Sequence, residues 1–166
     1  MLKITYNYEK RHDLVYQGGL VMVKPALGSG SRLYVIQNDS TDFKIYVGTA
    51  LHLDDRFDPR VTACRELGFS QIQMDPVWIF AVQVLIDDKP APPGDKGISS
   101  GGGWDIDVEW LLIRTYLQEL KLSVRNINKI GPFYNGTGGP ILWDLVDNAA
   151  LGFGRHAYKL NSGYYL

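Results

Sequence analysis

Two tyrosine-bearing segments decide the fold of this chain: Arg32-Leu33-Tyr34-Val35-Ile36 and, after a polar turn, Phe43-Lys44-Ile45-Tyr46-Val47-Gly48. Both are rich in the aromatic and aliphatic residues that strands favour. The intervening Asn38-Asp39-Ser40-Thr41-Asp42 consists of side chains that bond their own backbone and so favour a turn. The pattern predicts a β-hairpin with a tyrosine on each strand. A five-residue loop places Tyr34 opposite Tyr46, so that both phenols point to the same face.

The end of the second segment favours a functional use of this hairpin. Gly48 stands where a side chain would crowd anything that approaches the backbone. A bland alternative is that Tyr34 and Tyr46 are ordinary strand residues, because tyrosine is common in sheets. What separates the two interpretations is the order of the residues that follow, which ends at an arginine, Arg56.

That order resembles the GIY-YIG nuclease superfamily. The first family motif is glycine, an aliphatic residue and tyrosine; here it is Arg32-Leu33-Tyr34, without the leading glycine. The second motif is Tyr46-Val47-Gly48, with 11 residues between the two tyrosines, a gap typical of the family. The family's small residue, leucine and arginine are then met by Ala50, Leu53 and Arg56.

Glu109 adds a fourth element to the resemblance. In such nucleases a later helix carries a metal-binding glutamate ahead of a Leu-Ile pair, which Glu109-Trp110-Leu111-Leu112-Ile113 fits. We expect this helix to be capped by Asp105 or Asp107 and to run to about Leu122. The side chains along the same stripe are apolar, and an ionised carboxylate among them needs a partner. An ion pair with an arginine and a cation site are both open at this point.

The resemblance implies a metal-dependent endonuclease that hydrolyses phosphodiester bonds in DNA. Glu109 would hold one Mg²⁺ or Mn²⁺, and Arg56 would clamp the phosphate as negative charge builds on it. Tyr34 and Tyr46 would position the attacking water or accept its proton. The supporting positions are Gly48, His52, Arg60, where many relatives carry histidine or tyrosine, and either Asn126 or Asn128.

The expected fold is α+β, with a small central three-stranded antiparallel sheet flanked by helices and with N- and C-terminal additions. The apolar run 76–86 reads as the central strand, and helices are expected near 50–56 and over 58–67. Alternation of Ile4, Tyr6 and Tyr8 indicates further strands in the first thirty residues, and 141–146 suggests a closing helix. Residues 1–166 form one domain with a GIY-YIG-like core at 30–130, and 87–103 is a mobile Pro/Gly-rich loop insertion.

Composition allows this interpretation. At 166 residues with 45% hydrophobic content, the chain is long enough to bury one core. A single cysteine, Cys64, excludes an internal disulfide and favours a reducing compartment. The N-terminus lacks the apolar run of a signal peptide, and no segment is long enough to span a bilayer. We therefore expect a cytoplasmic protein without a membrane partner.

The net charge and the distribution of basic residues favour different interpretations. The chain has 17 basic and 18 acidic residues, whereas nucleic-acid binders usually carry a positive surplus. Five basic residues after position 120 can nonetheless bind phosphates, and some of them lie among aromatic residues. They are Lys121, Arg125, Lys129, Arg155 and Lys159. A solvated loop and a packed tail are the alternative. Neutral charge, the missing glycine and Arg60 also leave open a catalytically silent module that binds nucleic acid or a protein partner, and an oligomer is not excluded.

Overall fold

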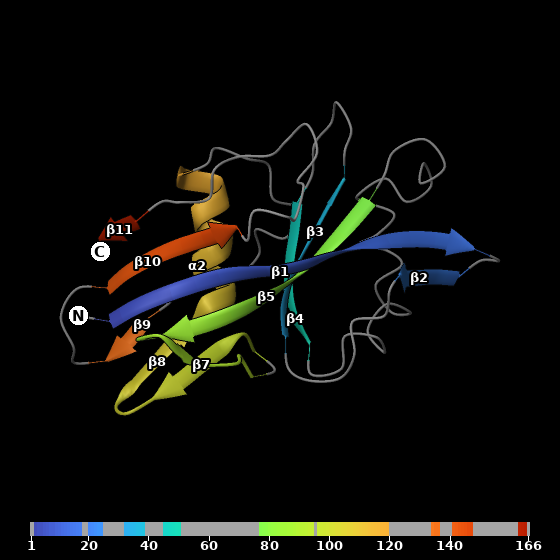
Figure 1. Cartoon of the computed structure of the whole chain (residues 1–166). Coiled ribbons are helices and arrows are strands. Elements are labelled where there is room, and N and C mark those ends of the chain that lie inside the picture. Colours follow the sequence, from blue (N-terminus) through green and yellow to red (C-terminus); the bar gives the residue numbers. More distant parts are fainter. Residues whose placement is uncertain are drawn as a thin grey trace.

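The computed structural model describes residues 2–17, 20–24, 32–38, 45–50, 77–94, 96–119, 134–136, 141–147 and 163–165. Within these residues an eight-stranded mixed sheet forms the frame of the protein (Figure 1). The main row of strands is β11 (Gly163–Tyr165), β10 (Ile141–Asp147), β1 (Leu2–Gln17), β5 (Val77–Ile86), β3 (Arg32–Asn38) and β4 (Ile45–Ala50). In addition, β2 (Leu20–Lys24) pairs with β1, and β6 (Lys89–Pro90) pairs with β5. The β1–β10 pair is parallel and the other described pairs are antiparallel.

The long strand β1 confirms the predicted N-terminal strands. Ile4, Tyr6 and Tyr8 are fully buried on one face, as their alternation requires. A register shift between Tyr8 and Arg11 marks a bulge, and β1 then continues past the end of β5 to pair with β2. The β1–β2 ribbon therefore extends beyond the rest of the sheet (Figure 1).

The central strand β5 was also predicted correctly. It lies between β1 and β3, and five consecutive residues, 78–82, are buried, which requires cover on both faces. The row β4–β3–β5 is antiparallel throughout, so the three strands expected from the sequence do pair with one another.

A smaller sheet leads into the helix. It contains β7 (Ile98–Gly101), β8 (Trp104–Asp107) and β9 (Tyr134–Gly136), with β8 in the middle. Helix α2 (Val108–Arg114) follows β8 directly and continues as a π-helical turn, η3 (Thr115–Glu119). Of the two predicted caps, Asp107 is the one used: its Oδ1 accepts from the backbone N–H of Trp110 at 2.8 Å.

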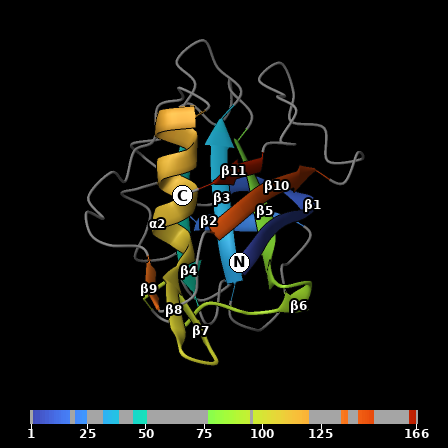
Figure 2. The same ribbon diagram turned by 90° about the vertical axis from the view of Figure 1, so that its left-hand side faces the viewer.

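Helix α2 packs against one face of the large sheet, where it runs alongside β3 and β4 (Figure 2). Its apolar side is formed by Val108, Leu111, Leu112 and Ile113. Two strand residues also bond to the helix: the Tyr6 hydroxyl donates to the Val108 carbonyl at 2.7 Å, and Trp143 Nε1 donates to Thr115 Oγ1 at 3.0 Å. A third bond joins the Tyr8 and Tyr116 hydroxyls. Both ends of the helix are thus fixed to the sheet.

The expected fold class is wrong. The predicted three strands are one end of a larger mixed sheet, and the described chain is mostly β, with α2 and η3 as its helical part. The terminal additions cause the difference, because β1 pairs with β5 and β10 pairs with β1. The helices expected near 50–56 and over 58–67 lie outside the described residues.

Two local predictions also require correction. Residues 141–146 belong to strand β10, since Ile141, Trp143 and Leu145 are buried at period two. The segment 87–103 was expected to be a loop insertion but contributes β6 and β7. Its first turn has Asp87 and Asp88 at φ 50 and 63, the conformation of a tight hairpin turn that aspartate tolerates.

Among the described residues, no helix combines the length and the apolar character needed to cross a membrane.

Candidate active site

The β3–β4 hairpin differs in register from the prediction. Tyr34 lies opposite Gly48, and Ile36 lies opposite Tyr46, so the expected Tyr34–Tyr46 pair is wrong. Because the slip is an even number of positions, both tyrosines still point to one face. The observed register puts an aromatic ring across the strand from a glycine, which leaves room for the ring.

Gly48 is packed tightly by both tyrosines. A Cβ built on Gly48 would lie 2.6 Å from Tyr34 Oη, 2.7 Å from Tyr34 Cζ and 3.0 Å from Tyr46 Cε1. The two rings stack with centroids 6.2 Å apart and an interplanar angle of 27°. Tyr34 is buried, whereas Tyr46 is half-buried. The glycine is therefore required here by close side-chain packing.

The two faces of this hairpin have different neighbours. The tyrosine face, which we define by Tyr34, Ile36 and Tyr46, carries the stacked phenols. The helix face, which we define by Leu33, Val35 and Thr49, faces α2. Leu33 and Val35 belong to the hydrophobic core that α2 completes.

Glu109 approaches the hairpin from the helix face. It lies in the first turn of α2, is half-buried, and its Oε2 accepts a hydrogen bond from Thr49 Oγ1 at 2.8 Å. Its backbone position is fixed through the preceding residue: the Val108 N–H donates to the Gly97 carbonyl at 2.9 Å, and the Val108 carbonyl accepts from Tyr6. The Glu109 carboxylate thus lies against Thr49 of β4.

The carboxylate and the phenols do not share a face. The Thr49–Glu109 bond lies on the helix face, while Tyr34 and Tyr46 lie on the tyrosine face. The predicted site requires these side chains to surround one phosphate, whereas here the sheet lies between the carboxylate and the phenols. Gly48 and Thr49 are nevertheless consecutive, and β4 ends the row of described strands. The backbone of β4 at Gly48 and Thr49 therefore borders the phenols on one face and the carboxylate on the other.

Most of the other predicted site residues lie outside the described residues. These are Arg56, His52, Arg60, Asn126 and Asn128, together with the predicted nucleic-acid contacts Lys121, Arg125, Lys129, Arg155 and Lys159. In sequence, Arg56 follows the last residue of β4, Ala50, by six positions.

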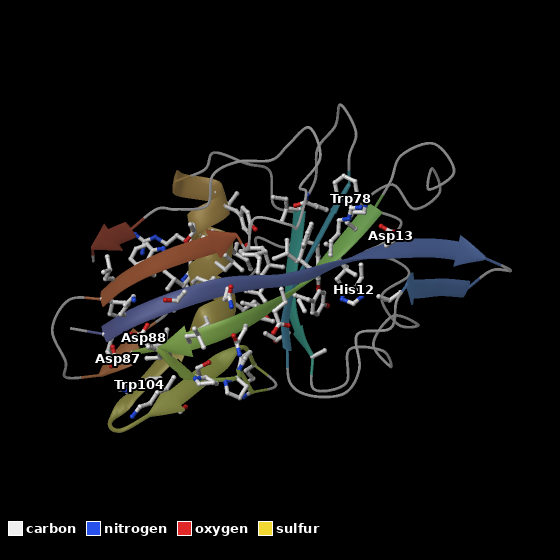
Figure 3. The ribbon with its side chains drawn as sticks, in the orientation of Figure 1. His12, Asp13, Trp78, Asp87, Asp88 and Trp104 are labelled. Atoms are coloured by element: carbon white, nitrogen blue, oxygen red, sulfur yellow. The ribbon has the colours of Figure 1, made fainter. Side chains whose placement is uncertain are left out.

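Glu109 fits a site in which one carboxylate holds a magnesium-like ion. Mg²⁺ commonly keeps several waters and binds one or two carboxylates plus substrate phosphates. In the part of the chain that the structure describes, no three metal-ligating side chains form a group. Asp13 lies toward the β2 end of the sheet, whereas Asp87 and Asp88 lie at the opposite end (Figure 3).

Two residues near the site were missed by the sequence analysis. Thr49 was not singled out, because nothing local distinguishes a threonine after a glycine, and its partner is 60 positions away. Tyr6 was expected only as a strand residue, but it bonds the residue before Glu109. Burial, with a smaller contribution from the negative charge of Asp107, raises the pKa of the Tyr6 phenol well above its usual value, so the hydroxyl stays a donor.

Comparison of the chain with protein-family models, with curated proteins and with solved structures gives no match. The GIY-YIG resemblance stays a prediction that rests on the motif residues.

Proposed function

We propose that this protein is a metal-dependent endonuclease that hydrolyses phosphodiester bonds in DNA, with its active site at the outer edge of β4. The observation that carries the proposal is the Thr49–Glu109 hydrogen bond. It holds an acidic side chain against Thr49, the residue that follows Gly48, and the Tyr34 phenol packs on Gly48 from the other face. Gly48 and Thr49, two consecutive residues of β4, thus border the phenols on one face of the sheet and the carboxylate on the other.

Each residue has a role set by its surroundings. Glu109 would hold Mg²⁺ or Mn²⁺, an ion that polarises the scissile phosphate and stabilises the leaving oxygen. Tyr46 is half-buried, the more exposed of the two phenols, so we assign it the contact with substrate, whereas buried Tyr34 supports it through ring stacking. A phenol with a pKa of about 10 is a weak base at neutral pH, so Tyr46 acts chiefly by orienting water or phosphate. Arg56 would bind the phosphate through two parallel hydrogen bonds.

A second candidate function is binding of nucleic acid or of a protein partner without catalysis. The observation that favours it is the placement of Glu109 on the helix face, across the sheet from both phenols. In that case the Thr49–Glu109 bond serves to attach α2 to β4, and the tyrosines serve packing.

Plasmid nicking separates the two candidates. The wild type, Glu109→Gln and the matched control Glu9→Gln are incubated with supercoiled plasmid in Mg²⁺ or Mn²⁺, and with a chelator. Glu9 is a half-buried residue of β1, with two strands between it and β4, so its variant removes a carboxylate elsewhere on the sheet.

We expect the wild type and Glu9→Gln to nick the plasmid and Glu109→Gln to be slower by about 100-fold or more. Equal rates for the wild type and Glu109→Gln would show that Glu109 has no catalytic role. Absence of cleavage in either metal would favour binding without catalysis, and salt-dependent retention of labelled DNA would then identify nucleic acid as the partner.

A further inference from the structure

We infer that Thr49 is a positioning residue, which orients the Glu109 carboxylate for a divalent cation. The inference rests on the proposed function, because it assigns the residue that prepares the cation ligand. Its basis is the 2.8 Å bond from Thr49 Oγ1 to Glu109 Oε2, which joins β4, the last strand of the described row, to the first turn of α2.

Thr49 is well suited to hold a side chain in one place. It is 5% exposed, lies in the paired part of β4 opposite Leu33, and is β-branched. Branching at Cβ restricts χ1, so the hydroxyl points in a defined direction. Glu109, by contrast, has a long and half-buried side chain, which loses rotamer freedom when it is ordered. A stiff donor on a strand therefore fixes a flexible acceptor on a helix.

The backbone of Glu109 does not need Thr49 for its position. Asp107 caps the helix, and the two backbone groups of Val108 bond to Gly97 and to Tyr6. The Tyr6 bond joins the start of α2 to β1, and none of these contacts involves Thr49. Loss of the Thr49 hydroxyl should thus release the carboxylate without releasing the helix.

The chemistry of the donor also suits a cation ligand. A hydroxyl is neutral, so it orients the carboxylate and leaves the carboxylate's negative charge in place to attract a cation. An arginine or lysine donor would instead neutralise that charge. Partners of this kind, one step removed from the metal, commonly change metal affinity by about 10–100-fold.

The chain offers matched variants. Thr49→Val removes the donor and keeps the branched shape, and Thr49→Ser keeps the donor. Thr5→Val is the control, since Thr5 is a half-buried threonine of β1 that lies opposite Leu85, away from β4. Thr49→Ala also lacks the donor and replaces Thr49→Val if that variant does not fold.

The experiment is calorimetric titration of Mn²⁺ into the full-length chain, with thermal melting of each variant in the absence of metal. We expect Thr49→Val to bind Mn²⁺ about tenfold more weakly than the wild type, and Thr49→Ser and Thr5→Val to bind within twofold of it. A donor-less variant that folds and binds Mn²⁺ as tightly as the wild type would overturn the inference and leave the proposed function intact. Absence of Mn²⁺ binding by the wild type would overturn both.

Discussion

Replacement of Gly48 by alanine tests the packing at the centre of the candidate site. The added methyl carbon would lie 2.6 and 2.7 Å from the Oη and Cζ atoms of Tyr34 and 3.0 Å from Cε1 of Tyr46. Ordinary contacts between such atoms lie near 3.5–4.0 Å, so something must move by almost 1 Å. Tyr34 is 1% exposed and cannot swing into solvent without opening the sheet face.

The expected cost follows from two opposing effects. Overpacking of a buried site costs about 1–3 kcal/mol, whereas replacing glycine by alanine gains about 0.4–1 kcal/mol through the unfolded chain. The net free energy of unfolding should fall by about 1–2 kcal/mol. For a domain of this size, that loss lowers the melting temperature by roughly 2–8 °C.

Urea unfolding monitored by tryptophan fluorescence measures the loss, because the chain has four tryptophans. With an m-value of about 2 kcal/mol/M, the midpoint should shift down by roughly 0.5–1 M. Gly102→Ala is the matched control, since a Cβ there meets nothing within 4 Å. Adding Tyr34→Phe to Gly48→Ala removes only the Oη contact and should restore part of the loss. If Gly48→Ala unfolds at the same urea concentration as the wild type and Gly102→Ala, the described tyrosine–glycine packing is incorrect.

Two further predictions concern the start of α2. Tyr6→Phe should cost about 1–3 kcal/mol near neutral pH, because the buried Val108 carbonyl loses its donor. Because the pKa of Tyr6 is raised in the folded protein, the phenol's contribution to stability is fully present below about pH 10 and is lost as the pH rises further. Above about pH 10 the free energy of unfolding of the wild type should therefore fall more steeply than that of Tyr6→Phe, by up to about 1.4 kcal/mol per pH unit. Parallel curves of unfolding free energy against pH for the two proteins would contradict this. Asp107→Ala should cost about 1 kcal/mol through loss of the Trp110 bond, and Asp107→Asn should retain most of the stability; equal losses in urea unfolding would show that the cap is not the cause.

The local part of the fold was predictable from the sequence. Alternating residues such as Ile4, Tyr6 and Tyr8 identify β1, because a strand that buries one face has an apolar residue at every second position. The long apolar run identifies β5, because a strand that buries both faces is apolar at nearly every position. The arrangement of the strands was not predictable in the same way. The parallel pairing of β10 with β1 joins residues about 140 positions apart and leaves no local signal. Residues 141–146 satisfy both helical and strand spacing, and only their place in the sheet decides between them.

In the candidate site, too, local features were predictable from the sequence and contacts between distant segments were not. Alternation correctly placed Tyr34 and Tyr46 on one face, but their register depends on how a ring fits over Gly48, which is a three-dimensional property. The side of the sheet reached by Glu109 is set by where α2 packs. Its partner, Thr49, belongs to a distant segment and could be identified only from the packed structure.

Binding of a divalent cation by Glu109 at the outer edge of β4 can be observed in a crystal. The most direct measurement is the anomalous signal of Mn²⁺ in crystals of the full-length protein. We expect a peak about 2 Å from a Glu109 carboxylate oxygen, with the Thr49 hydroxyl still bonded to Oε2. A structure at millimolar Mn²⁺ in which Glu109 carries no peak and is paired with an arginine or lysine would contradict it.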